Sequence, residues 1–120
     1  MKVEVLITTM HQHNSDLYRK MNLQTDAVIA NQADVSGYKE TVINNHRVRL
    51  ITTDSRGVSR NRNIAIAHSS QDADVLLFSD DDLIFNDGYE EQITDEFLKH
   101  PEAEAIKFNL HDLSNFRKYP

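Results

Sequence analysis

Short apolar runs separated by polar stretches recur along the whole chain. Four of these runs are rich in β-branched or large apolar residues and predict strands, at residues 3–9, 27–30, 48–53 and 75–79. A further run at 105–110 alternates, which predicts another strand with one apolar face. The polar stretch between the second and third runs is weakly patterned. It is compatible with a loop or with a loop that contains an edge strand around Thr41-Val42-Ile43.

The segments between the apolar runs favour helices. Ser15 can cap a short helix that follows it, and residues 59–69 have a helical composition. Asp87 and Glu90 have the spacing of a capping box, which predicts that a third helix begins at Asp87. The apolar residues of that helix recur every four positions and predict a buried stripe of Tyr89, Ile93 and Phe97.

Strands that alternate with helices predict an α/β fold with a mostly parallel, twisted sheet and helices on both faces. The 120 residues suffice for one domain, and we expect this domain to be part of a longer protein. Ligands of such sheets bind beyond the carboxyl ends of the strands. Three strand ends are polar here, so we expect them to meet at one rim: Thr8-Thr9, Asn31-Gln32 and Asp80-Asp81-Asp82.

The acidic triplet directly follows the apolar run Val75-Leu76-Leu77-Phe78. Adjacent carboxylates repel one another, so a cation that neutralises them is a simple explanation for their place at a strand end. If the backbone stays extended, Asp80 and Asp82 share one side and Asp81 points to the other. Two carboxylates form an oxygen-only site suited to Mg²⁺ or Mn²⁺, with open positions for a diphosphate. The alternative is an acidic turn that faces water.

A second polar stretch, Arg56 to Asn63, combines a glycine turn, a helix start and three arginines. Helix N-termini and guanidinium groups favour anions, although a solvated basic turn would look the same. The net charge of −6 argues against a general nucleic-acid binder, and the absence of cysteine excludes disulfides and thiolate metal sites. No apolar run approaches the roughly 20 residues of a transmembrane helix. These features are compatible with a cytoplasmic protein.

Together the two stretches resemble the family 2 glycosyltransferases of GT-A fold. In that family a Gly-x-Ser-x-x-Arg-Asn segment opens a helix and the next strand ends in Asp-x-Asp, as in Gly57 to Asn63 and Asp80 to Asp82 here. The first strand is also similar, so the resemblance covers roughly residues 3–88. The residues after the first two strands are similar to those of bacterial polysaccharide-synthesis members.

The resemblance implies an inverting transfer from a nucleotide sugar, most often a UDP-sugar, to a saccharide acceptor. Asp82 matches the metal ligand, with Asp80 near the ribose and the metal. The other residues that the resemblance places in the nucleotide-sugar site are Thr9 and Met10 beside the base, Gly57 at the turn, Arg62 near the nucleotide, Asp81 within the acidic motif, and Asn31 where the family often has an acid for the base.

The resemblance also implies that the catalytic base and the acceptor-binding part lie further along the family's chain. We therefore expect residues 1–120 to be a truncated donor-binding domain that is inactive alone, from a protein that is peripheral at the inner face of the membrane. Two other functions stay open. One is a non-catalytic interaction module of the same fold. The other is a metal-dependent phosphoryl-transfer domain, although such domains need an acid at the end of the first strand, where Thr8-Thr9 stand.

Overall fold

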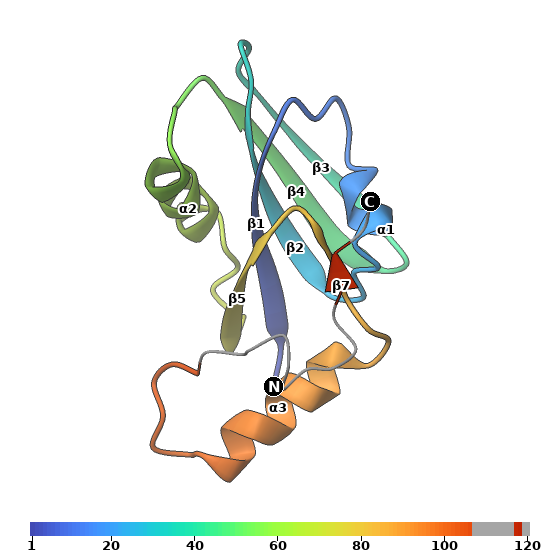
Figure 1. Ribbon diagram of the computed structural model, residues 1–120, viewed down its shortest axis with the longest axis vertical. Helices are drawn as coiled ribbons and strands as arrows, with labels where there is room; N and C mark the ends of the chain where they lie inside the picture. The colour runs from blue at the N-terminus through green and yellow to red at the C-terminus, as the bar shows by residue number, and fades with distance from the viewer. Residues whose placement is uncertain (107–116, 119–120) are drawn as a thin grey trace.

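The computed structural model describes residues 1–106 and 117–118. Strands and helices alternate over most of this length (Figure 1). The strands are β1 (Val3–Met10), β2 (Asp26–Gln32), β3 (Gly37–Ile43), β4 (His46–Thr53), β5 (Val75–Asp80), β6 (Leu83–Ile84) and β7 (Arg117–Lys118). The helices are α1 (Leu17–Lys20), α2 (Val58–Ala67) and α3 (Tyr89–Lys99).

Five strands form the main sheet, in the order β3-β4-β2-β1-β5. β1, β2, β4 and β5 run parallel, and β3 pairs antiparallel with β4 at one edge. This confirms the predicted mostly parallel α/β sheet. Of the two possibilities for the weakly patterned stretch, the edge strand is correct, and β3 is longer than the expected 41–43. β6 and β7 form a separate antiparallel pair.

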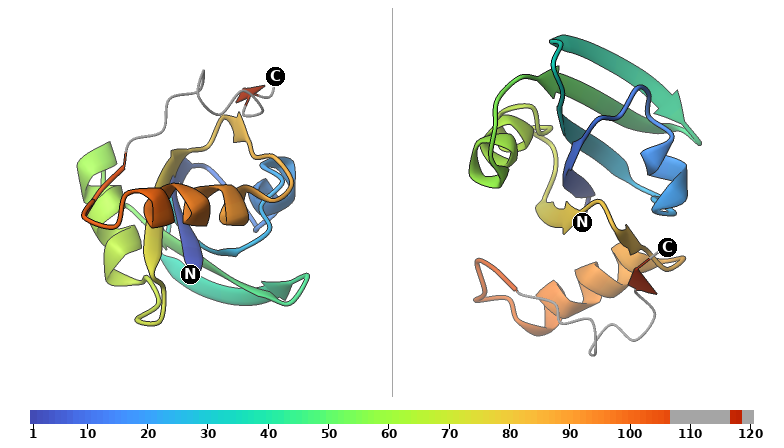
Figure 2. Two further views of the ribbon diagram at one scale, coloured as in Figure 1. Left: turned by 90° about the horizontal axis from the view of Figure 1, so that it is seen from below. Right: turned by 45° about the horizontal axis from the view of Figure 1, so that its top comes forward.

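Helices cover both faces of the sheet, as predicted (Figure 2). Alternate residues of β1 point to opposite faces, so Val5 and Ile7 join the core under α1 and α3, whereas Leu6 joins the core under α2. The buried stripe of α3 is confirmed, because Tyr89 and Ile93 are fully buried and Phe97 packs against the same core. The main core therefore lies between the sheet and the two helices α1 and α3.

The predicted start of α3 is wrong. The helix begins at Tyr89 after Gly88, whose φ of 80° only glycine adopts readily, and no side chain caps it. The Asp87 carboxylate instead accepts a hydrogen bond from Asn22 Nδ2 at 2.9 Å, and Glu90 accepts one from the backbone N–H of Val3 at 3.1 Å. Both acids thus connect α3 to distant parts of the chain, which local spacing cannot reveal.

The predicted cap of α1 is also wrong. Asp16 occupies the cap position without a side-chain hydrogen bond, and the buried Ser15 hydroxyl has no partner among the described residues. The strand predicted at 105–110 falls mainly on residues 107–110, which lie outside the described residues, and Ala105 and Ile106 are not in a strand. No helix in the described part of the chain is both long and apolar enough to cross a membrane.

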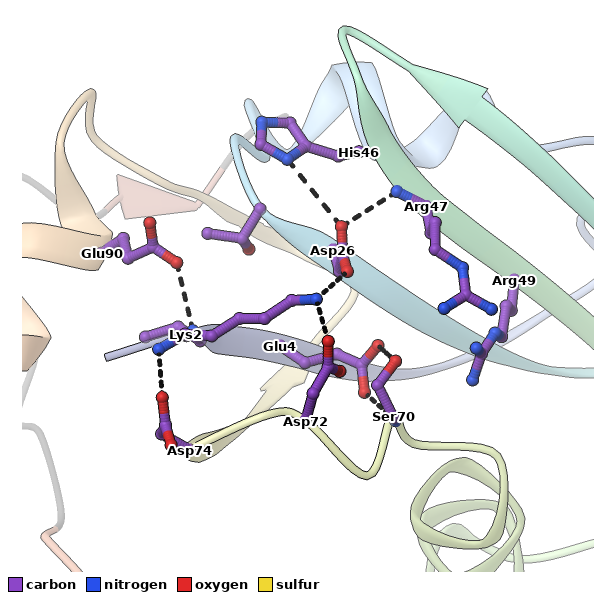
Figure 3. A network of polar contacts seen from close by, with 12 residues as sticks. Lys2, Glu4, Asp26, His46, Arg47, Arg49, Ser70, Asp72, Asp74 and Glu90 are labelled. Carbon is purple, nitrogen blue, oxygen red and sulfur yellow. Dashed lines mark hydrogen bonds and ion pairs between the residues drawn. The ribbon is translucent and has the colours of Figure 1, made fainter.

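A network of charged groups holds the amino ends of the strands together (Figure 3). Lys2 Nζ lies 3.2 Å from the Asp26 carboxylate and 2.9 Å from that of Asp72, and its hydrogen bond lowers the pKa of Asp72. The buried Glu4 carboxylate accepts hydrogen bonds from the backbone N–H of Ser70 at 2.7 Å and from its hydroxyl at 3.0 Å. Because Ser70 and Asp72 belong to the loop between α2 and β5, this network fixes where β5 enters the sheet.

Candidate functional site

The carboxyl ends of β1 and β5 form one wall of a cavity of about 480 Å³. β1 lies between β2 and β5 in the sheet. The strands that follow β1 in the chain are therefore added on its β2 side as far as β4, and β5 is then added on its other side. Such a reversal of strand order leaves a crevice at the carboxyl ends of the strands, where ligands of α/β proteins bind. The cavity is lined by Thr8, Thr9, Met10, Gln32, Gly57, Val58, Asn61, Asp80, Asp81 and Asp82.

All three acids of the triplet line this cavity, including Asp81. The expectation that Asp81 points away is wrong because β5 ends at Asp80 and the chain turns at Asp81 and Asp82, so strand alternation no longer applies. The Thr9 hydroxyl donates a hydrogen bond to the Asp81 carboxylate at 2.8 Å and accepts one from Gln12 Nε2 at 3.1 Å. This chain of bonds joins the end of β1 to the acidic turn.

The first turn of α2 also lines the cavity, through Val58 and Asn61 and the preceding Gly57. Gly57 precedes the helix with a φ of 105°, a conformation that side chains with a β-carbon rarely adopt. Its backbone N–H donates to Gln32 Oε1 at 3.3 Å, which ties the helix start to the end of β2. One turn further, the Asn61 side chain is only 4% exposed, and its Oδ1 atom has no hydrogen-bond partner among the described residues.

Two of the residues expected at the site do not line the cavity. Asn31 is buried at the end of β2, and its carboxamide hydrogen-bonds Gln12 and Thr52. Its Oδ1 atom accepts a hydrogen bond from the backbone N–H of Gln12 at 3.0 Å. Its Nδ2 atom donates to the Gln12 carbonyl at 2.8 Å and to Thr52 Oγ1 at 3.1 Å. Arg62 is exposed on α2. The structure brings the other six together: Thr9, Met10, Gly57, Asp80, Asp81 and Asp82.

Four cavity residues were not expected to bind there: Thr8, Gln32, Val58 and Asn61. Thr8 and Gln32 lie in the polar strand ends that the sequence does reveal. For Asn61 the available signal was its position four residues before Ala65, which places both on one face of α2. An asparagine on the buried face of a helix is unusual, and this pattern could have marked it.

The donor atoms of the acidic turn suit a hard divalent cation, because three carboxylates line the cavity there and such cations prefer oxygen ligands. Over residues 1–106 and 117–118, no group of three or more His, Cys, Asp or Glu side chains is arranged to hold a metal ion by itself. Asp80 and Asp82, at the strand end and in the turn, remain the predicted ligands.

Comparison with protein families matches residues 24–119 to glycosyl transferase family 2. Searches of curated proteins and of solved structures gave no match. The family assigns glycosyl transfer as the general role, with a nucleotide sugar and an acceptor as partners, and the mostly parallel sheet agrees with the GT-A fold. The match covers β2 to β5 with the acidic turn, whereas β1 precedes it. Since the match extends over most of the 120 residues, this chain belongs to glycosyl transferase family 2.

Proposed function

We propose that this protein binds a UDP-sugar in the cavity beside the acidic turn and supports metal-dependent transfer of the sugar, with inversion, to a saccharide hydroxyl. The observation that carries the proposal is the meeting of Asp80, Asp81 and Asp82 with the end of β1 and the first turn of α2 around one cavity. Family membership supplies the reaction class, and the cavity supplies a place for the donor.

The acidic turn has the composition for holding a diphosphate through a cation. Asp80 and Asp82 would hold Mg²⁺ or Mn²⁺, which supplies positive charge that stabilises a departing nucleoside diphosphate. Asp81 has a different task in this proposal. Its hydrogen bond from Thr9 keeps the acidic turn against the end of β1, so that the carboxylates stay within the cavity.

The remaining parts of the proposal extend the resemblance. We assign the described residues to donor binding, and place activation of the acceptor hydroxyl on a carboxylate outside the cavity described above. A role in surface polysaccharide synthesis at the inner face of the membrane follows from the same resemblance. Identification of the acceptor by product analysis tests this part.

A thermal-shift experiment tests the proposed donor site. The protein is heated with UDP and Mn²⁺, with Mg²⁺, with each component alone, and with EDTA. A ligand that binds only the folded protein stabilises it by about 2.7 kcal/mol at 100 times its Kd. We expect a rise in Tm only when UDP and a metal are present together.

Two variants locate the effect. Asp82→Asn keeps the shape of the side chain but removes its charge, and we expect it to abolish the metal-dependent rise. Asp95→Asn makes the same change at an exposed position of α3, outside the cavity, and should respond as the unchanged protein does. The proposal is wrong if millimolar UDP with metal gives no shift, or if Asp82→Asn retains the full shift.

A further inference from the structure

Asn61 occupies a position where a polar side chain does not help the fold. It and Ala65 are the buried residues of α2, one turn apart on the face that packs on β1 and β2. Asparagine is a poorer helix former than alanine or leucine. A buried carbonyl oxygen without a partner also costs the folded state the loss of its hydration, and Asn61 Oδ1 is such an oxygen within the described residues. An apolar residue would serve the helix better here.

The location of Asn61 suggests what its carboxamide is for. The side chain lines the cavity on the side of α2, beside Gln32, Gly57 and Val58, whereas the acids line the side of β5. The cavity therefore has an acidic side, suited to a diphosphate and its cation, and a side without charge. The uncharged side suits a nucleoside, which carries neutral N–H, O–H and carbonyl groups.

Asn31, expected where the family often has an acid for the base, does not line the cavity. The Asn31 carboxamide is 99% covered and already makes three hydrogen bonds to Gln12 and Thr52. Gln32 lines the cavity, but its Oε1 atom accepts the hydrogen bond from Gly57 that ties α2 to β2. Two carboxamides line the cavity, those of Gln32 and Asn61, and of these the Asn61 oxygen is the one without a hydrogen bond to the described residues.

We propose that Asn61 is a specificity-determining residue of the donor site, whose carboxamide oxygen accepts a hydrogen bond from an N–H or O–H group of the bound nucleoside. This inference rests on the nucleotide-sugar function proposed above. The terminal torsion of asparagine is broad and roughly two-fold, so the carboxamide can turn its oxygen toward the cavity when a donor arrives. The imide N–H of uracil and the hydroxyls of ribose share the required chemistry.

Asn61→Leu tests the inference because leucine has nearly the same size and removes the polar group. If Asn61 serves the ligand, the variant should unfold at the same or a higher urea concentration than the unchanged protein. Its Kd for UDP with Mn²⁺, measured by calorimetry, should rise about 3- to 10-fold, the range expected for one neutral hydrogen bond. Gln92→Leu makes a matched change on α3, outside the cavity, and should leave the Kd unchanged.

Three UDP analogues identify the donor group: 3-methyl-UDP, which lacks the imide N–H, and the 2′-deoxy and 3′-deoxy forms of UDP. The group that Asn61 accepts from is the one whose removal abolishes the difference in affinity between the unchanged protein and Asn61→Leu. Loss of the difference with any one analogue supports the inference. A difference that persists with all three analogues overturns it, since the hydrogen bond then does not come from the nucleoside.

Other results also separate the two proposals. If the unchanged protein binds UDP with metal and Asn61→Leu binds it equally well, the role of Asn61 is wrong and the donor site stands. Marked destabilisation of Asn61→Leu with unchanged affinity likewise overturns the inference, because Asn61 is then a structural residue. If the unchanged protein binds neither UDP nor CDP, ADP or GDP with metal, both proposals fail together.

Discussion

Replacing Tyr89 by phenylalanine should weaken the junction of α3 with β2 more than its single lost oxygen suggests. The Tyr89 side chain is fully buried, and its hydroxyl accepts a hydrogen bond from the backbone N–H of Gln24 at 3.0 Å and shares another with the hydroxyl of Thr25, itself 2% exposed. Two lost hydrogen bonds at about 1 kcal/mol each, with a buried Thr25 hydroxyl left unsatisfied, amount to about 2–4 kcal/mol.

Tyr18→Phe is the matched control for this change. Tyr18 is equally buried, but its hydroxyl makes one hydrogen bond, to the Thr25 carbonyl at 2.7 Å, so the expected loss is about 0.5–1.5 kcal/mol. Both variants are compared with the unchanged protein by urea unfolding, followed by far-UV circular dichroism. The slope of free energy against urea should stay constant, so that the change in midpoint reports stability.

A double-mutant cycle with Thr25→Val sharpens the test. Once Tyr89→Phe has removed the hydroxyl, Thr25→Val removes the group left unsatisfied, so the double variant should lose less than the sum of the single changes, by at least about 0.5 kcal/mol. The reasoning fails if Tyr89→Phe costs no more than Tyr18→Phe, or if the two changes are additive.

The same hydroxyl should contribute to alkaline unfolding. Burial raises the pKa of Tyr89 above its ordinary value, with the hydrogen bond from Thr25 acting in the opposite direction. A group whose pKa is higher in the folded state contributes stability that is complete below its unfolded pKa, about 10, and is lost as the pH rises through the folded value. Tyr89→Phe should therefore lose less stability than the unchanged protein between neutral and strongly alkaline pH.

Three further changes test other parts of the structure. Gly57→Ala should lower the free energy of unfolding in urea by about 1–3 kcal/mol, because alanine rarely adopts the positive φ of this position. Steric contact does not add to this cost, since an added β-carbon meets no atom within 4 Å. An unchanged midpoint would contradict the prediction. Ile93→Ala should lower the free energy of unfolding by about 2–5 kcal/mol, because Ile93 is fully buried. Leu98→Ala, on the exposed side of α3, should change it by no more than about 0.5 kcal/mol. Equal losses in the two variants would refute this view of the core. Asp72→Asn should reduce stability at neutral pH, because the hydrogen bond from Lys2 lowers the pKa of Asp72. This contribution to stability is present above the ordinary aspartate pKa and is lost as the pH falls through the lowered value. The stabilities of the two proteins should therefore converge in acid, and a constant difference down to pH 2 would contradict this.

The sequence predicted the sheet well because its parallel strands are nearly continuous apolar runs, the pattern typical of parallel sheets. β1, β2, β4 and β5 all lie where these runs predict them. The predicted caps of α1 and α3 were wrong because capping depends on which partner a side chain finds in the folded chain. Asp87 has the spacing of a cap, yet its carboxylate accepts a hydrogen bond from Asn22 Nδ2.

The candidate site was predictable as far as strand ends define it. The triplet at the end of β5 and Thr9 at the end of β1 meet as the parallel arrangement requires. Asn31 and Asn61 illustrate the limit. Both are buried asparagines, but one is saturated by Gln12 and Thr52 and the other has an unpartnered oxygen, a difference that depends on tertiary contacts and not on residue type.

The central place of β1 has a consequence for the order of folding. β1 can pair with β2 after a short connection, but its pairing with β5 must wait for most of the intervening chain. Non-local parallel pairings of this kind form slowly because loop-closure entropy opposes them. We therefore expect the capacity to bind nucleotide to appear last during refolding, after most of the far-UV signal has recovered. Stopped-flow refolding in the presence of a fluorescent nucleotide would show this delay, and binding that keeps pace with the first strands would exclude it.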